Sequence, residues 1–377
     1  MQNLWFLFVI ALIVQLTNGI PSKSRRTEMR RFESSSTKNF EFGWTFYISK
    51  NYFAQQVSVA FDLESPYTIL YDANYVQTNK WPQSSYYDYY QPNDSLSFKT
   101  QNASFALDYN QDTQDTPTKV GGIWANDVVI FGLEATQNRK ASYYNASFGL
   151  IQSGDHFLPS DTIFAYTGRL GMSLNGSDDN WVVRAFKKEC DGIVTFVVVG
   201  NEFVLSFGSM EMSNCDQNAK LVENVVETSP QIGKQKWQIQ AESVEIGKYT
   251  YSNAQLVSFT FSTHYIVAPS QYFEILIQQL EAYEEGDRYV VDCSKVAKAP
   301  KLSFEFNSGI LNILGTNYIE EDKEKKNTEC YLLIRESTDS SNLDHWSIGS
   351  LLERSYCLSL DFTNEQVTLQ PVTDNIN

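Results

Sequence analysis

The amino-acid sequence predicts a mostly β protein built from two related lobes. Stretches such as WTFYISK (44–50) and QQVSVAFD (55–62) alternate apolar and polar residues, which is the period of a half-buried strand. Aromatic residues make up 14% of the chain, and their side chains pack well on a pleated surface. The chain has 377 residues, which is enough for two lobes of ordinary domain size.

A weak internal repeat is the second reason to expect two lobes. The stretch FDLESPYTIL (61–70) is similar to FTFSTHYIVA (259–268), and each is followed by an apolar-Gly signature, TGRLGM (167–172) and WSIGSL (346–351). The two halves therefore share one order of elements, with loops of different length. A cleft between such lobes is the natural place for a ligand.

Two further elements can be predicted from local patterns. Residues 193–209, IVTFVVVGNEFVLSFGS, predict a hairpin that turns at Gly200-Asn201. Residues 269–286 predict a helix, which Pro269 and Ser270 open and Gly286 closes. Its expected apolar face consists of Phe273, Leu276, Ile277, Leu280 and Tyr283.

The N-terminus is typical of an exported chain. An apolar run of 11 residues from Leu4 to Val14 is too short to span a bilayer, so we expect a signal peptide over residues 1–19, with an uncleaved anchor as the alternative. Residues 20–38 are polar and basic, and predict a flexible tail or a very short pro-segment. The two lobes are then expected at 39–222 and 223–377.

Export would give the cysteines and the glycosylation motifs a meaning. Four Asn-x-Ser sequons begin at Asn93, Asn102, Asn145 and Asn175, all in the first half of the chain. Each is a candidate glycosylation site. We therefore expect a secreted glycoprotein, located outside the cell or in the lumen of the secretory or lysosomal pathway.

The five cysteines of the chain allow two disulfides and one remaining thiol. Cys190 and Cys215 flank the predicted hairpin, so a bridge closing that loop is expected. The apolar neighbours of Cys357 predict that it is buried in a strand.

Charge and composition exclude several classes of function. The chain carries 29 basic and 45 acidic residues, a net charge of −16, which argues against a nucleic-acid ligand. The three histidines, His156, His264 and His345, show no clustered spacing with Cys or Asp, so we expect no metal and no cofactor. The mature chain has no other apolar run of membrane length, and we expect a monomer away from the membrane.

Several segments, taken in order, resemble the pepsin family of aspartic peptidases over about residues 40–372. They are GGIWANDVVIFG (121–132), WQIQAESVEIG (237–247), VDCSKVAKAPKLSFEFNSG (291–309) and HWSIGSLLERSYCLSLDFTNEQVTLQPV (345–372). The resemblance implies a bilobal β fold with a peptide-binding cleft between the lobes. It also implies a disulfide between Cys293 and Cys330 in the second lobe. With the expected Cys190–Cys215 bridge, Cys357 is then left over as a buried thiol, and an intermolecular bridge is the alternative.

The family's chemistry needs two aspartates, one ionised and one protonated, which together activate a water. Each lies in an Asp-Thr-Gly motif. Here the first motif reads Asp62-Leu63-Glu64-Ser65, whereas the second reads Thr260-Phe261-Ser262-Thr263. Thr260 would stand at the second aspartate position, and a hydroxyl can only form hydrogen bonds there. The resemblance implies that Tyr109 is the counterpart of the family's flap tyrosine, without the glycines that usually follow it.

Alternatives remain for the individual residues. Asp62 is either a surviving catalytic carboxylate or a buried aspartate hydrogen-bonded to Ser65 and Thr260. Glu64 or Asp72 could replace the missing acid, although neither lies in the second lobe. The tyrosine-rich stretch at 84–90 is either a recognition loop or surface packing.

The sequence therefore leads to one preferred function and two alternatives. The preferred function is a secreted, catalytically inactive homologue of the aspartic peptidases that binds a peptide or protein. An active aspartic endopeptidase is the first alternative, and a structural secretory protein is the second. Loss of the second aspartate and of both motif glycines favours the catalytically inactive homologue.

Overall fold

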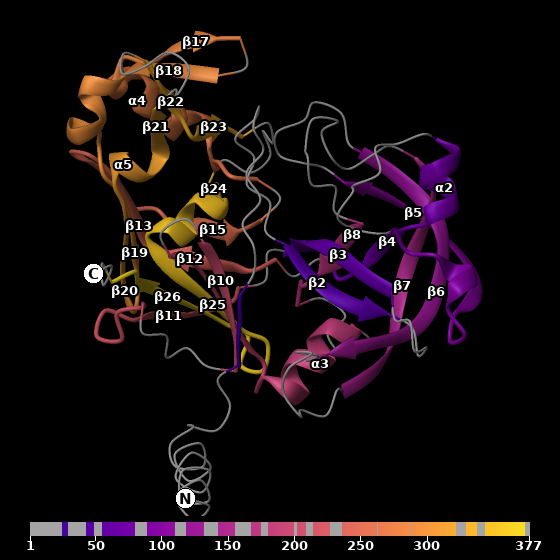
Figure 1. Cartoon of the computed structure of the whole chain (residues 1–377). Helices are drawn as coiled ribbons and strands as arrows, with labels where there is room; N and C mark the ends of the chain where they lie inside the picture. The colour runs from indigo at the N-terminus through magenta and orange to yellow at the C-terminus, as the bar shows by residue number, and fades with distance from the viewer. Residues whose placement is uncertain are drawn as a thin grey trace, which may run out of the picture.

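The protein is a two-lobed β structure (Figure 1). The computed structural model describes residues 25–28, 43–48, 55–79, 89–109, 118–131, 142–154, 167–174, 180–199, 202–208, 214–226, 236–261, 263–286, 288–321, 329–337 and 344–373. Strands dominate these residues and form several sheets, with few helices. The predicted fold class is confirmed. The proposed signal peptide at 1–19 lies outside the described residues.

One seven-stranded sheet forms the first lobe, in the order β2-β3-β8-β4-β7-β6-β5. Its strands are β2 (Gly43–Ile48), β3 (Gln55–Asp62), β4 (Ile69–Tyr71), β5 (Lys99–Tyr109), β6 (Thr118–Phe131), β7 (Ser142–Gly154) and β8 (Gly168–Gly171). The helical segments are α2 (Ala73–Thr78), η1 (Pro92–Asp94) and α3 (Trp181–Glu189). Helix α3 buries Trp181, Val183 and Phe186, and the sequence patterns had not indicated it.

Three smaller sheets form the second lobe, in the orders β12-β15-β24-β16-β23, β14-β13-β19-β20 and β17-β18-β22-β21. Their strands are β12 (Gln238–Ala241), β13 (Ser243–Ile246), β14 (Tyr249–Tyr251), β15 (Gln255–Phe259), β16 (Ile266–Ala268), β17 (Tyr283–Glu285), β18 (Arg288–Asp292), β19 (Leu302–Phe306), β20 (Gly309–Ile313), β21 (Ile319–Glu321), β22 (Glu329–Leu332), β23 (Ile334–Glu336) and β24 (His345–Ile348). The helical segments are α4 (Ser270–Leu280), α5 (Gly315–Tyr318), η2 (Cys293–Lys298) and η3 (Ser350–Arg354).

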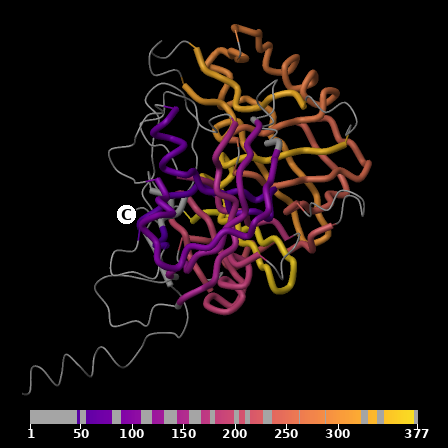
Figure 2. Tube along the Cα trace, turned by 90° about the vertical axis from the view of Figure 1, so that its right-hand side faces the viewer, coloured from indigo at the N-terminus to yellow at the C-terminus, as the bar shows by residue number. Residues whose placement is uncertain are grey.

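A six-stranded sheet joins distant parts of the chain, in the order β1-β10-β9-β25-β26-β11. Its strands are β1 (Arg25–Glu28), β9 (Ile193–Val199), β10 (Glu202–Phe207), β11 (Leu221–Asn224), β25 (Tyr356–Asp361) and β26 (Gln366–Pro371). Strands β9 and β25 are hydrogen-bonded neighbours, so segments near residues 195 and 360 run close together in Figure 2.

Strand β1 differs from the expectation of a flexible N-terminal tail. Residues 25–28 pair antiparallel with β10, with Arg25 opposite Phe207. One edge of β10 pairs with β9, and β1 takes the other edge. An open sheet edge can order a segment that has no apolar periodicity of its own. The rest of the 20–38 segment lies outside the described residues.

The predicted hairpin is confirmed, and the predicted helix is confirmed only in part. Val199 pairs with Glu202 across a two-residue connection. Helix α4 begins at Ser270 as expected but ends at Leu280, because Glu281 adopts a left-handed conformation with φ 49°. The extension to Gly286 was therefore wrong. Tyr283 lies in β17 with its ring exposed instead of on the buried helix face.

The disulfides also differ from the sequence-based expectation. Cys293 pairs with Cys330, as the family resemblance implied, but Cys215 pairs with Cys357. The expected Cys190–Cys215 bridge and the leftover Cys357 thiol were wrong. Cys190 caps α3 and packs in the main core, whereas Cys215 and Cys357 share a separate apolar cluster with Val197.

The two disulfides should contribute unequally to stability. The Cys215–Cys357 bridge closes a loop of 142 residues and the Cys293–Cys330 bridge one of 37. Chain entropy predicts that replacing the longer-range pair by serines costs about 2–5 kcal/mol, roughly 1 kcal/mol more than replacing the shorter-range pair. Urea unfolding midpoints of the two double variants test this. Equal losses of stability in the two double variants would contradict it. So would a disulfide-linked peptide that contains Cys190 in a non-reducing digest.

Candidate functional site

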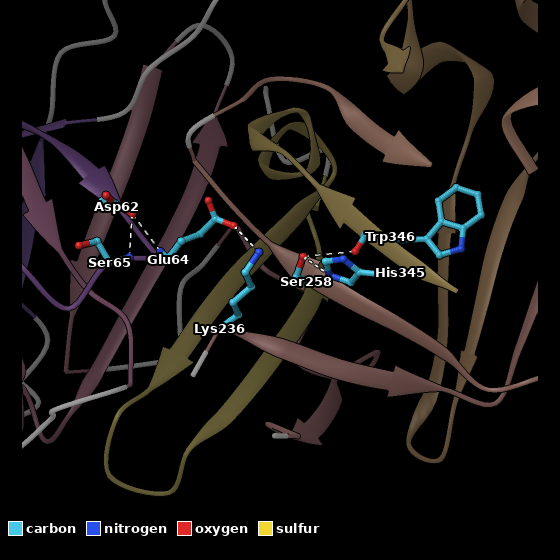
Figure 3. Close-up of polar contacts among 7 residues, drawn as sticks. All are labelled: Asp62, Glu64, Ser65, Lys236, Ser258, His345 and Trp346. Atoms are coloured by element: carbon cyan, nitrogen blue, oxygen red, sulfur yellow. Dashed lines mark hydrogen bonds and ion pairs between the residues drawn. The ribbon is translucent and has the colours of Figure 1, made fainter. Parts of the chain in front are cut away.

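Asp62 stands at the last residue of β3, and its side chain organises the turn that follows. Its Oδ1 accepts hydrogen bonds from the backbone N–H groups of Glu64 (3.0 Å) and Ser65 (2.9 Å) (Figure 3). The residue is only 4% exposed. The carboxylate therefore satisfies two backbone donors that the tight turn would otherwise leave unpaired.

A buried arginine faces the same region. Arg169 on β8 is opposite Ala60 on β3, so it shares one face of the sheet with Asp62, two residues further along. Burial raises the pKa of Asp62, while the Arg169 charge lowers that pKa and the neighbouring Glu64 charge raises it. Arg169 thus favours the ionised carboxylate in an environment that disfavours any charge.

Thr260 occupies the equivalent position in the second lobe. Strand β3 runs parallel to β8, with Asp62 opposite Gly171. Strand β15 runs parallel to β24 in the same way, with Phe259 opposite Ile348, and the Thr260 N–H donates to the Ile348 carbonyl at 3.1 Å. Thr260 is 1% exposed. One lobe therefore carries a buried carboxyl at this position and the other a buried hydroxyl.

The turns after the two positions have the same local hydrogen bond. The Ser65 hydroxyl accepts the Tyr67 N–H at 3.1 Å, and the Thr263 hydroxyl accepts the Tyr265 N–H at 3.1 Å. Ser65 and Thr263 each lie three residues beyond Asp62 and Thr260. This correspondence supports the sequence alignment of the two motifs on independent geometric grounds.

The two motif segments pack against each other. The rings of Phe61 and Phe261, next to Asp62 and Thr260, lie 6.3 Å apart, and Phe196 packs on both at 5.4 and 4.7 Å. These separations are typical of interacting aromatic pairs. No sequence pattern indicated that Phe196, from the predicted hairpin, would pack against both motifs.

Glu64 and Asp72, the two candidate replacement acids, are held by other groups. The Glu64 carboxylate lies 3.0 Å from the Lys236 ammonium (Figure 3). Asp72 caps α2 by accepting the Asn74 N–H at 2.9 Å, and its other oxygen accepts from Gln152 at 3.0 Å. Both acids therefore have structural partners in the first lobe or at the start of the second.

The histidines are also in structural contacts. His264 Nδ1 lies 3.1 Å from the Ser350 hydroxyl, and both residues are buried. His345 Nε2 lies 3.0 Å from the Ser258 hydroxyl, which also contacts the Trp346 carbonyl at 3.3 Å (Figure 3). Ser258 is buried, so a substrate could not reach it as a nucleophile. His156 lies outside the described residues.

The flap and the tyrosine-rich stretch are only partly covered by the structure. Tyr109 ends β5, and its side chain lies outside the described part. Residues 81–88 are also outside it. Tyr90, the last tyrosine of the stretch, is buried and donates a hydrogen bond to Asp127 at 2.6 Å. For Tyr90, packing rather than recognition is the better interpretation.

Three of the four sequon asparagines lie on the surface of the described structure. Asn93, Asn102 and Asn145 are exposed, whereas Asn175 lies outside the described residues. Within the described ranges, no group of three His, Cys, Asp or Glu side chains could hold a metal ion. In that same part of the chain, no helix has the length and apolar character needed to cross a membrane.

The duplicated strand crossovers and the buried acid define a two-lobed protein of the aspartic-protease class. The chain matches the family described as eukaryotic aspartyl protease over residues 48–372, and it belongs to that family. Renin of Rattus norvegicus is 22% identical over 135 residues, which are 35% of this chain and 34% of that protein. Renin-2 of Mus musculus is 24% identical over 136 residues, with the same coverage of 35% and 34%. The chain thus spans about a third of the length of these curated relatives.

The pairing of charges between Asp62 and Arg169 can be tested with a double-mutant cycle. Asp62→Asn keeps the oxygen that accepts the turn's N–H groups but removes the charge, and Arg169→Met removes the opposite charge. We expect the double variant to lose less free energy of unfolding than the two single variants lose together, by roughly 0.5–3 kcal/mol. Denaturant midpoints of the four proteins give this value.

A matched cycle uses Glu64→Gln with Arg169→Met, because the Glu64 carboxylate is paired with Lys236. That cycle should be close to additive. Arg169→Met should also raise the pKa of Asp62 further, since it removes the charge that lowers it; a carboxyl NMR titration measures this. Additive losses in both cycles would show that Arg169 and Asp62 are not coupled.

Proposed function

We propose that the protein is a catalytically inactive member of the aspartyl protease family that acts by binding a peptide or protein between its lobes. The observation that carries the proposal is the equivalence of Asp62 and Thr260, with a carboxyl on one side and a hydroxyl on the other. Peptide hydrolysis in this family needs two titrating groups that split their protonation. A threonine hydroxyl neither gains nor loses a proton in the required pH range.

The surroundings of Asp62 support the same proposal. Its carboxylate accepts two backbone N–H groups and lies near the Arg169 charge, so the residue has a structural use that does not require catalysis. Leu63 and Glu64 stand where the motif has Thr and Gly. Retention of the acid alone is therefore no argument for retained activity.

Binding needs no second acid, because the family's peptide ligands are held by the two lobes as well as by the reacting groups. The family binds peptide substrates in a cleft. On the first lobe, Tyr67 is 42% exposed and packs on Trp124 with ring centroids 5.1 Å apart. Trp124 in turn packs on Phe105 at 5.1 Å. Aromatic groups of this kind are frequent energetic centres of peptide and protein interfaces.

The proposed setting is the secretory pathway, with a signal peptide at 1–19 and sugars at Asn93, Asn102, Asn145 and Asn175. The exposure of the first three asparagines is compatible with this. We propose a monomer that needs no cofactor. Mass spectrometry of the natural protein would identify both the first residue and the modified asparagines.

Peptide cleavage is the first test of the proposed function. Purified protein is incubated with a diverse peptide pool from acidic to neutral pH, beside Asp62→Asn and with a pepstatin-type inhibitor as a second control. We expect no cleavage by either form in folded samples. Cleavage that disappears in Asp62→Asn would overturn the proposal and favour the active endopeptidase, with a second acid still to be found.

Binding is tested with a peptide library displayed against the immobilised protein. Tyr67→Ala should lower the affinity for the selected ligands by roughly 30-fold, since loss of a central aromatic contact costs on the order of 2 kcal/mol. Tyr249→Ala is the matched control, because Tyr249 is 44% exposed but lies on β14 of the second lobe. Equal effects of the two variants would place the ligand elsewhere. Failure to select any ligand would favour the structural alternative.

A further inference from the structure

A buried glutamate in the second lobe has no role in the proposed binding function. Glu353 lies in η3, the short helical segment between β24 and β25, and is 1% exposed. The segment packs on β9 and β25 of the six-stranded sheet and on α5. A carboxyl in such a place is unusual, since acidic side chains are almost never fully buried unless they are paired.

The surroundings of the carboxyl provide little compensation for a charge. Its Oε2 has no hydrogen-bond partner among the described residues. The ionisable groups on the elements packed around it are Arg354 of η3, Tyr356 and Asp361 of β25 and Tyr318 of α5, whereas β9 has none. His264 also contacts η3, with its Nδ1 3.1 Å from the Ser350 hydroxyl. Burial is the main cause that raises the pKa of Glu353 well above its usual value, and a hydrogen bond from its own backbone N–H lowers that pKa.

The segment is also directly tied to the loop that contains Thr260. The Ser350 N–H, at the start of η3, donates to the Thr263 carbonyl at 3.0 Å. The Gly349 N–H donates to the Tyr265 carbonyl at 2.9 Å. A Cβ added to Gly349 would lie 2.4 Å from the carbonyl oxygens of Thr263 and Tyr265, so the approach is very close. Movement of η3 would therefore change the support of this loop.

We propose that Glu353 is a pH-operated latch: while its carboxyl is uncharged, η3 stays packed on the six-stranded sheet, and loss of the proton releases η3 and loosens the Thr260 loop. The proton goes to solvent and returns on acidification, so the switch is reversible. It requires no ligand and does not depend on whether the protein binds peptides. The packed state is favoured in acidic surroundings.

The sign of the pH effect follows from linkage. In the unfolded chain the carboxyl titrates near its ordinary pKa of 4.5, whereas the folded value is higher. The folded state therefore binds more protons, and stability falls as pH rises from about 4.5 to the folded pKa. Across that window each pH unit raises the unfolding equilibrium constant up to about tenfold, and above the folded pKa the loss is complete.

The experiment compares the purified protein with Glu353→Gln, which stays uncharged at every pH. Glu274→Gln is the matched control, because Glu274 is an exposed glutamate on α4. Unfolding midpoints and amide hydrogen exchange are measured from pH 4.5 to 8, with exchange corrected for the intrinsic rate. We expect faster exchange at the Gly349 and Ser350 amides at high pH in the native protein and in Glu274→Gln. In Glu353→Gln these amides should stay protected.

Three results would overturn the latch. One is a parallel loss of stability with rising pH in the native protein and Glu353→Gln. The second is unchanged protection of Gly349 and Ser350 across the whole pH range. The third is loosening of every amide together, which would mean global destabilisation without a local latch. If Glu353→Gln does not fold, Glu353→Leu replaces it, since an apolar side chain suits the same surroundings and also cannot ionise.

Discussion

The rest of the structure depends on two close backbone approaches, one in each lobe. Gly171 lies against the turn after Asp62, and Gly349 lies against the turn after Thr260. A Cβ on Gly171 would lie 2.5 Å from the backbone N and O of Tyr67, and one on Gly349 would lie 2.4 Å from the Tyr265 carbonyl oxygen. Only glycine allows the two backbone segments to come so near in each lobe. Each approach holds the turn after Asp62 or Thr260 in place, and both turns have the same hydroxyl-to-amide hydrogen bond.

Within this duplicated frame the two lobes have diverged in chemistry while retaining geometry. The first lobe keeps a carboxyl and places a buried arginine on the same face of its sheet. The second lobe has a hydroxyl at the equivalent position and a histidine that contacts Ser350 nearby. Because removal of one of two interacting buried charges is costly, the influence of Arg169 gives Asp62 a structural reason to be present that does not depend on catalysis.

The six-stranded sheet contains strands from both halves of the chain. Its strands come from the N-terminal segment, the middle of the chain and the C-terminal region, and a disulfide links Cys357 of β25 to Cys215, which precedes β11. The segment η3 packs on the same sheet and begins directly after the Gly349 crossover. A change in the ionisation of Glu353 would therefore act at the point where the shared sheet and the second motif meet.

The sequence by itself determined the features that repeat along the chain. Strand alternation predicted the β fold, a Gly-Asn dipeptide predicted the β9–β10 hairpin, and the internal repeat aligned Thr260 with Asp62. These patterns are local, because each arises from the backbone period or from turn residues close together in sequence. The start of α4 was also local, while its end depended on the conformation of Glu281.

Only the tertiary structure decided which distant side chains meet. The pairing of Cys215 with Cys357, the position of Arg169 beside Asp62 and the burial of Glu353 each join or enclose residues that no local pattern relates. The sequence signal for Arg169 was a charged residue within the apolar stretch TGRLGM, and the signal for Glu353 was a charged residue within GSLLER. Such a residue cannot be interpreted from sequence, because burial and charge partners are properties of the packed chain.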